Sequence, residues 1–123
     1  MNVIKRGNIE KMQLPGRVIQ QAVGKGQAVS PSTEMTMGFA FYSEASGPME
    51  PHSHAEEIVY ILGAQNGWIL YGDHADRLDH RIELAEGMTL HIPAQEWHVF
   101  QFEEGGHVDI IFFYSTPDIF STS

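Results

Sequence analysis

Glycine and proline recur so closely along this chain that the stretches between them are too short for long helices. The 123 residues include 12 glycines and 6 prolines, which interrupt helices and favour turns. The intervening stretches are rich in β-branched and aromatic residues and recur about every ten residues, as in all-β domains. We therefore predict an all-β sandwich or barrel of antiparallel strands. The predicted strands are 17–23, 34–42, 57–62, 67–71, 80–84, 88–92, 97–102 and 107–114.

Length, charge and composition narrow the classes of protein. The chain is short enough to be one domain, 1–123, with an N-terminal arm at 1–13 and a barrel core at 34–114. The only helical candidate is a turn or two around Ile9–Leu14. The absence of cysteine excludes disulfides and thiolate metal sites. A net charge of −9 makes nucleic acid and anionic membranes poor partners. With no long apolar run and no signal-peptide pattern, we expect a cytoplasmic protein.

Two strands show which faces should be buried. In the strand 34–42, large Met and Phe side chains alternate with small residues, and we predict that the large ones form the barrel core. In the strand 107–114, both faces are apolar from Ile110 onward. One face can line the barrel, and the other needs a cover, since monomers seldom expose large apolar patches. We expect a homodimer; the main alternative is that the arm folds back over this face.

A cluster of histidines and carboxylates indicates a metal site. His52 and His54 stand two residues apart, so on an extended strand they project to the same face. Glu57 follows with an oxygen ligand, and His98 is the best placed fourth ligand by its sequence context. Neutral imidazole and carboxylate suit one divalent transition metal, namely Fe, Mn, Ni, Co or Zn. Four protein ligands leave an open position where the ion could act as a Lewis acid.

These residues lie in two stretches that together resemble the cupin superfamily, in particular its small RmlC-like members. GPMEPHSHAEEIVYILG, residues 47–63, resembles the first cupin motif, and GMTLHIPAQEWH, residues 87–98, resembles the second. The resemblance implies a conical β-barrel, the double-stranded β-helix or jelly roll, with a metal near its mouth. It also implies the four ligands. By position these are His52, His54, Glu57 and His98.

The chain departs from the cupin pattern in places. The gap between His54 and the glutamate is shorter than usual, and Glu56 fits the distance to the closing glycine better than Glu57 does. We prefer Glu57 as the ligand and keep Glu56 as the alternative. Gln95 stands where a glycine is usual in the second motif, and Phe102 stands at the usual asparagine position.

Strand parity predicts the walls of a cavity beside the metal. Residues that share parity with His98 or with Glu57 should point inward with them, forming an apolar chamber for a small, largely apolar or metal-chelating molecule. The predicted cavity residues are Val59, Ile61, Phe100 and Phe102.

Other polar residues have less specific interpretations. Arg17 is the one basic residue considered for the cavity mouth, although a solvated surface arginine is the preferred interpretation. His91 is either a general acid or base near the metal or, as we prefer, an ordinary strand histidine. His74 and His80 belong to a polar loop.

Two classes of function fit this sequence. The first is a metalloenzyme of the dioxygenase, lyase or isomerase type acting on a small molecule. The second is a non-catalytic module that binds a small molecule or metal for sensing or storage. We favour the enzyme because the ligand set is complete and leaves an open position, although a fold does not determine function.

Overall fold

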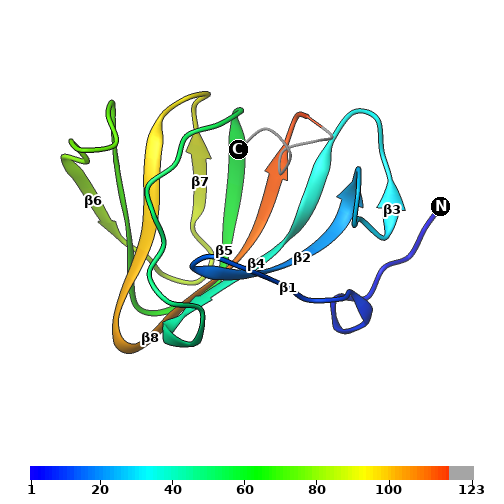
Figure 1. Ribbon diagram of the computed structural model, residues 1–123, viewed down its shortest axis with the longest axis horizontal. Helices are drawn as coiled ribbons and strands as arrows, with labels where there is room; N and C mark the ends of the chain where they lie inside the picture. The colour runs from blue at the N-terminus through cyan, green and yellow to red at the C-terminus, as the bar shows by residue number, and fades with distance from the viewer. Residues whose placement is uncertain (117–123) are drawn as a thin grey trace.

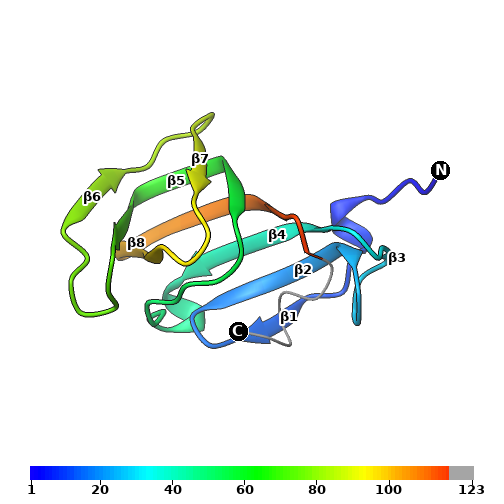
Figure 2. The ribbon, with the colours of Figure 1, turned by 90° about the horizontal axis from the view of Figure 1, so that it is seen from above.

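The structure, a computed structural model, describes residues 1–116 as one curled sheet (Figures 1 and 2). Its hydrogen-bonded order is β1-β2-β4-β8-β5-β6, with β3 beside β2 and β7 beside β5. The all-β prediction is confirmed. Within these residues, helical structure amounts to two 3-10 turns, and none of it is long and apolar enough to cross a membrane. The elements are η1 (Arg6–Asn8), β1 (Met12–Leu14), β2 (Arg17–Gly24), β3 (Ser30–Pro31), β4 (Thr36–Ser43), η2 (Glu44–Ser46), β5 (Glu57–Gly72), β6 (His80–Glu83), β7 (Thr89–Ile92) and β8 (Trp97–Tyr114).

β5 and β8 are long antiparallel partners where the sequence predicted four separate strands. They pair from Glu57↔Tyr114 to Gly72↔Trp97, with register shifts near Gly63 and Gly67. Figure 1 shows β8, coloured from gold to red, turning sharply at its middle. Glycine allows β8 to bend there beside β5, because a Cβ on Gly106 would lie 2.5 Å from the Gln65 carbonyl oxygen. The glycines therefore bend continuous strands rather than end them.

The buried face of β4 is the opposite of the predicted one. Ala40 and Tyr42 belong to the core, whereas the Met and Phe side chains lie on the outer face, half-buried or exposed. The reason is the close approach of neighbouring strands: a Cβ on Gly38 would lie 2.6 Å from the Gln20 carbonyl oxygen and 2.7 Å from the Phe112 ring. The interior of the barrel accepts only small residues at this point, so the larger ones face outward.

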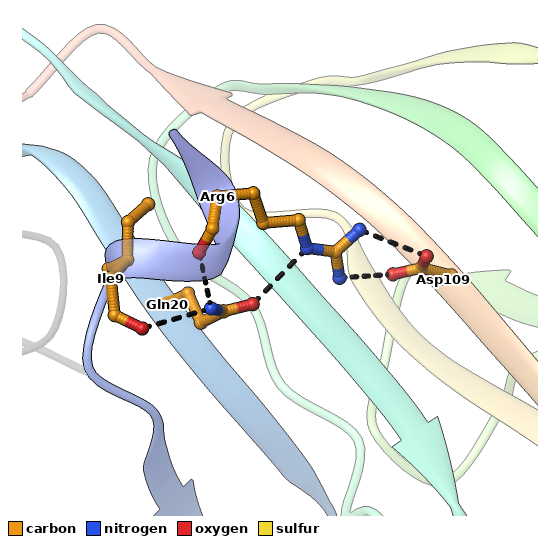
Figure 3. Close-up of polar contacts among 4 residues, drawn as sticks. All are labelled: Arg6, Ile9, Gln20 and Asp109. Atoms are coloured by element: carbon orange, nitrogen blue, oxygen red, sulfur yellow. Dashed lines mark hydrogen bonds and ion pairs between the residues drawn. The ribbon is translucent and has the colours of Figure 1, made fainter. Parts of the chain in front are cut away.

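The N-terminal arm crosses this outer face (Figure 3). The Arg6 guanidinium donates two hydrogen bonds to the Asp109 carboxylate, at 3.0 and 2.7 Å, and lies 4.6 Å from the centre of the Phe39 ring. The Gln20 amide donates to the carbonyls of Arg6, at 2.9 Å, and Ile9, at 3.0 Å. These contacts connect the arm to β2, β4 and β8, so part of the outer face is covered within one chain.

The helical candidate around Ile9–Leu14 does not form a helix. Met12–Leu14 pairs with β2 as strand β1, and the only helical turn of the described arm is η1. Beyond the arm, the outer face still exposes apolar side chains, including Ile58 and Phe113. The homodimer therefore stays a prediction.

Replacing Arg6 by alanine is expected to lower the free energy of unfolding by about 1–2 kcal/mol, because a half-buried charged pair is lost. Arg81→Ala is a matched control, since Arg81 also contacts a carboxylate, Glu83, and an aromatic ring, Trp68. The Arg81 and Glu83 side chains are 51% and 65% exposed, against 34% and 23% for Arg6 and Asp109. The control should lose less than about 1 kcal/mol. Urea denaturation measures the free energy of unfolding of both variants. An equal loss of stability in the two would contradict the conclusion that Arg6 holds the arm on the sheet.

Candidate metal centre and cavity

The two sequence motifs meet through their backbones. The amide of His52 donates to the carbonyl of His98 at 3.1 Å, and the amide of His98 donates back at 3.0 Å. The amide of Gln95 donates to the carbonyl of His54 at 2.8 Å. Gln95 has a φ of 70°, so the second motif adopts a left-handed turn there without a glycine. This pairing, rather than one extended strand, brings the three histidines together.

The three imidazoles converge on one place. One ligand atom from each of His52, His54 and His98 lies within 4.8 Å of the others. Neighbouring ligand atoms around a tetrahedral ion with bonds of about 2.1 Å lie roughly 3.4 Å apart, so the side chains would close in by about 1 Å on binding. Each Nδ1 contacts a backbone carbonyl oxygen: Glu50 at 3.3 Å for His52, Ala55 at 3.3 Å for His54, and Glu96 at 2.9 Å for His98. Such contacts hold the proton on Nδ1 and leave Nε2 as the ligand atom.

Glu57 is the carboxylate that faces these histidines. Its Oε1 lies 3.5 Å from His98 Nε2, and neither buried atom has a hydrogen-bond partner among the described residues. Unsatisfied buried polar atoms need an explanation, and a cation between them would satisfy both. The donors present therefore fit a divalent transition-metal ion. The alternative, Glu56, points outward and contacts His91 Nε2 at 2.6 Å.

Burial keeps two of the histidines neutral. Desolvation, followed by the charges of His98 and His54, lowers the pKa of His52 to about 3. Desolvation also lowers the pKa of His54, partly offset by the charge of Glu57. Neutral imidazole is the form that binds metals, so near neutral pH these two rings need lose no proton before binding.

Tyr114 is a site residue that the sequence analysis did not select. Its hydroxyl lies 3.2 Å from His54 Nε2. Burial, and then the charge of Glu57, raise the pKa of its phenol well above the ordinary value, so it stays protonated. It ends the inward row of β8 that also contains Val108, Ile110 and Phe112. That row was visible in the sequence, but nothing there showed that its last member would reach a histidine.

A cavity of about 250 Å³ opens beside the histidines. Of the predicted wall residues, Phe100 lines it, whereas Val59 and Ile61 are fully buried in the core and Phe102 lines a separate hollow with Trp68. Strand parity gives the direction of a side chain but not its depth, which explains the difference. The cavity is lined by Pro15, Arg17, Ile19, Ala40, Tyr42, Glu50, Pro51, His52, His54, Glu57, His98, Phe100, Ile110, Phe112 and Tyr114.

The remaining histidines lie elsewhere. The side chain of His91 is 63% exposed, contacts Glu56 and is not part of the lining of this cavity. His80 stacks on Tyr71 with ring centres 5.0 Å apart, and His74 forms an isolated bridge with Arg77 in an exposed loop. Arg17, whose preferred interpretation was a solvated residue, instead lines the cavity.

Comparisons with known proteins show similarity in structure only. No sequence-family model matches the chain, and neither does any curated protein. The polyketide cyclase RemF from Streptomyces resistomycificus matches with a TM-score of 0.72 at 16% identity, over 93% of this chain and 78% of that one. The iron(II) form of HppE matches with a TM-score of 0.67 at 14% identity, over 93% of this chain and 60% of that one.

A third similar structure is oxalate decarboxylase of Bacillus subtilis, a protein with Mn(II) centres. It matches with a TM-score of 0.70 at 15% identity, over 98% of this chain and 30% of that one. This chain thus spans less than two thirds of HppE and of the decarboxylase. The three matches cover nearly all of this chain with the same arrangement of strands. The chain therefore has the cupin β-barrel fold.

Proposed function

We propose that this protein binds one divalent transition-metal ion through His52, His54, His98 and Glu57 and acts on a small molecule in the adjoining cavity. The observation that supports this most directly is the pair of buried, unpartnered atoms, Glu57 Oε1 and His98 Nε2, beside two further imidazoles. Iron(II) in HppE and Mn(II) in oxalate decarboxylase favour these two metals here. A bound ion with an open position would supply Lewis acidity at the cavity wall.

The chain's own residues would orient the substrate and keep water out. Phe100, Ile110 and Phe112 give the cavity apolar walls. The protonated Tyr114 hydroxyl lies 3.2 Å from His54 Nε2, and with that atom bound to the ion it would be free to donate a hydrogen bond to a substrate oxygen. These features support a metalloenzyme of the dioxygenase, lyase or isomerase type.

A non-catalytic metal-binding or ligand-binding module is the second candidate. Its support is the position of His91: with this residue outside, the described cavity has no histidine besides the three proposed ligands that could move a proton. Oxygen uptake or product formation with small diketones, enols and catechols would favour the enzyme over the module.

Metal analysis of purified protein tests the proposed centre. Wild-type protein should contain about one transition-metal ion per chain, as sites with three or four protein ligands do. His52→Ala and His98→Ala should each remove most of it, because every ligand is needed for tight binding. His91→Ala is the matched control and should keep the metal, since this histidine lies outside. Full occupancy in the double variant of His52 and His98 would end the assignment.

The two glutamates can be separated by the same measurement. Glu57→Gln should weaken metal binding, because Glu57 faces His98. Glu56→Gln should not, because Glu56 contacts the exposed His91. The reverse result would make Glu56 the ligand.

A further inference from the structure

Arg17 is the only lysine or arginine that lines the cavity. It begins β2, and it lies opposite Tyr42 by continuation of the register Val18↔Phe41. Ile19, two residues further along β2, lines the same cavity. Arg17 thus belongs to the inward row of its strand, and its side chain is only half-buried. A guanidinium is therefore held at the wall of the same cavity that the three histidines line.

Arg17 has no acidic partner among residues 1–116. Within these residues, the one hydrogen bond of its guanidinium goes from Nη1 to the carbonyl of Pro15, at 2.9 Å. The other arginines that lie on the sheet, Arg6 and Arg81, are each paired with a carboxylate. In a chain of net charge −9, acidic partners are plentiful, yet this cation is unpaired. A guanidinium at a cavity wall that has no carboxylate partner keeps its donors for an anionic ligand in the cavity.

Tyr42 provides a second free polar group at the same place. The residue is 4% exposed and lines the cavity, with its ring packed against Phe100 at a centre distance of 4.8 Å. Its hydroxyl makes no hydrogen bond within the described part of the chain and, unlike Glu57 Oε1 and His98 Nε2, is not fully enclosed, so it is open to a ligand in the cavity. The guanidinium and the hydroxyl both donate hydrogen bonds. Arg17 and Tyr42 are neighbours on the adjacent strands β2 and β4, so the two groups form a pair of donors suited to one carboxylate.

We propose that Arg17 and Tyr42 bind the carboxylate of a small organic acid, whose apolar body packs on Phe100 and Phe112 and whose other end reaches the histidines. This inference rests on the proposed function and names its class of substrate. The planar guanidinium matches a carboxylate with two parallel hydrogen bonds. A monoanion is favoured over a phosphate dianion, because Glu50 and Glu57 also line the cavity, and the proposed divalent ion and Arg17 together exceed their negative charge by only one.

Calorimetric titration of the full chain, with its metal as purified, tests this subsite. Benzoate is the probe, and benzamide is the neutral probe of the same shape. Arg17→Gln should weaken benzoate binding at least tenfold, which corresponds to about 1.4 kcal/mol, and should leave benzamide unaffected. Arg77→Gln is the matched control: it removes the same charge from an exposed loop and should bind benzoate as wild type does. Arg17→Lys should recover part of the affinity, because lysine restores the positive charge but cannot donate two parallel hydrogen bonds to a carboxylate.

Tyr42→Phe provides a second route, since it keeps the ring against Phe100 and removes only the hydroxyl. It should weaken benzoate binding severalfold, which keeps the inference testable if Arg17→Gln misfolds. Equal benzoate affinity in wild type, Arg17→Gln and Tyr42→Phe would overturn the subsite. So would no saturable binding of benzoate to wild type at millimolar concentration, or tighter binding of inorganic phosphate than of benzoate.

Metal content, measured on the same samples, separates this inference from the proposed function. Arg17→Gln should retain as much metal as wild type, because Arg17 is not a ligand. Benzoate binding that depends on the metal and is unchanged in Arg17→Gln would place the carboxylate on the ion and overturn the subsite alone. Wild-type protein that binds no transition metal would overturn the metal centre, while the variants would still decide whether Arg17 binds the acid.

Discussion

Replacing Gly38 by alanine is expected to lower the free energy of unfolding by about 2 kcal/mol, in the middle of the range for overpacked cores. The added methyl would lie 2.6 Å from the backbone oxygen of Gln20 and 2.7 Å from the Phe112 ring. The ring can move, but the carbonyl belongs to the paired strand β2 and can shift only with the sheet. Because Phe112 also lines the cavity, the substitution should narrow the cavity as well.

Gly63→Ala is the matched control, since Gly63 also lies within a strand and a Cβ there would meet nothing within 4 Å. It should be neutral or slightly stabilising, because alanine has less conformational entropy to lose on folding. Urea denaturation of both variants decides the matter. If Gly38→Ala is as stable as Gly63→Ala, the close approach of β2, β4 and β8 is not as tight as described.

Metal-free protein is expected to lose about 2 kcal/mol of stability between pH 6.5 and pH 4.5. The pKa of His52 is lowered from 6.5 to about 3 in the folded protein. As the pH falls below 6.5, the unfolded chain therefore binds a proton that the folded chain does not bind until about pH 3. Where the pH lies well below the unfolded pKa and well above the folded pKa, each further fall of one pH unit lowers the free energy of unfolding by about 1.4 kcal/mol. His54, whose pKa is also lowered, contributes in the same direction.

Thermal melts of chelator-treated protein across this pH range measure the effect. His52→Gln should flatten the decline, because the group with the depressed pKa is removed, whereas His74→Gln in the exposed loop should not. Metal-loaded protein should resist acid better until protons displace the ion. A melting temperature of metal-free wild type that is independent of pH between 4.5 and 6.5 would show that these histidines are not buried as described.

The sequence by itself determined the strand character of the chain and the residues of the candidate centre. Closely spaced glycines and prolines exclude long helices. This effect acts within short stretches of the chain, so it could be predicted without knowing which residues meet in the folded structure. The grouping of His52, His54 and His98 was also predictable. The two motifs that contain these histidines can be recognised from the sequence without knowing how the strands are arranged. Glu57 over Glu56 was a preference that parity alone could not decide.

Only the tertiary structure decided which faces are buried and which side chains meet. The Met and Phe residues of β4 turn outward because Gly38 lies against Gln20 and Phe112, a contact between strands distant in sequence. Arg17 and Tyr114 reach the cavity because β2 and β8 are brought to it by the curl of the sheet. Alternation along a strand defines two faces, but the packing of other strands determines which face is interior and how deep each residue lies.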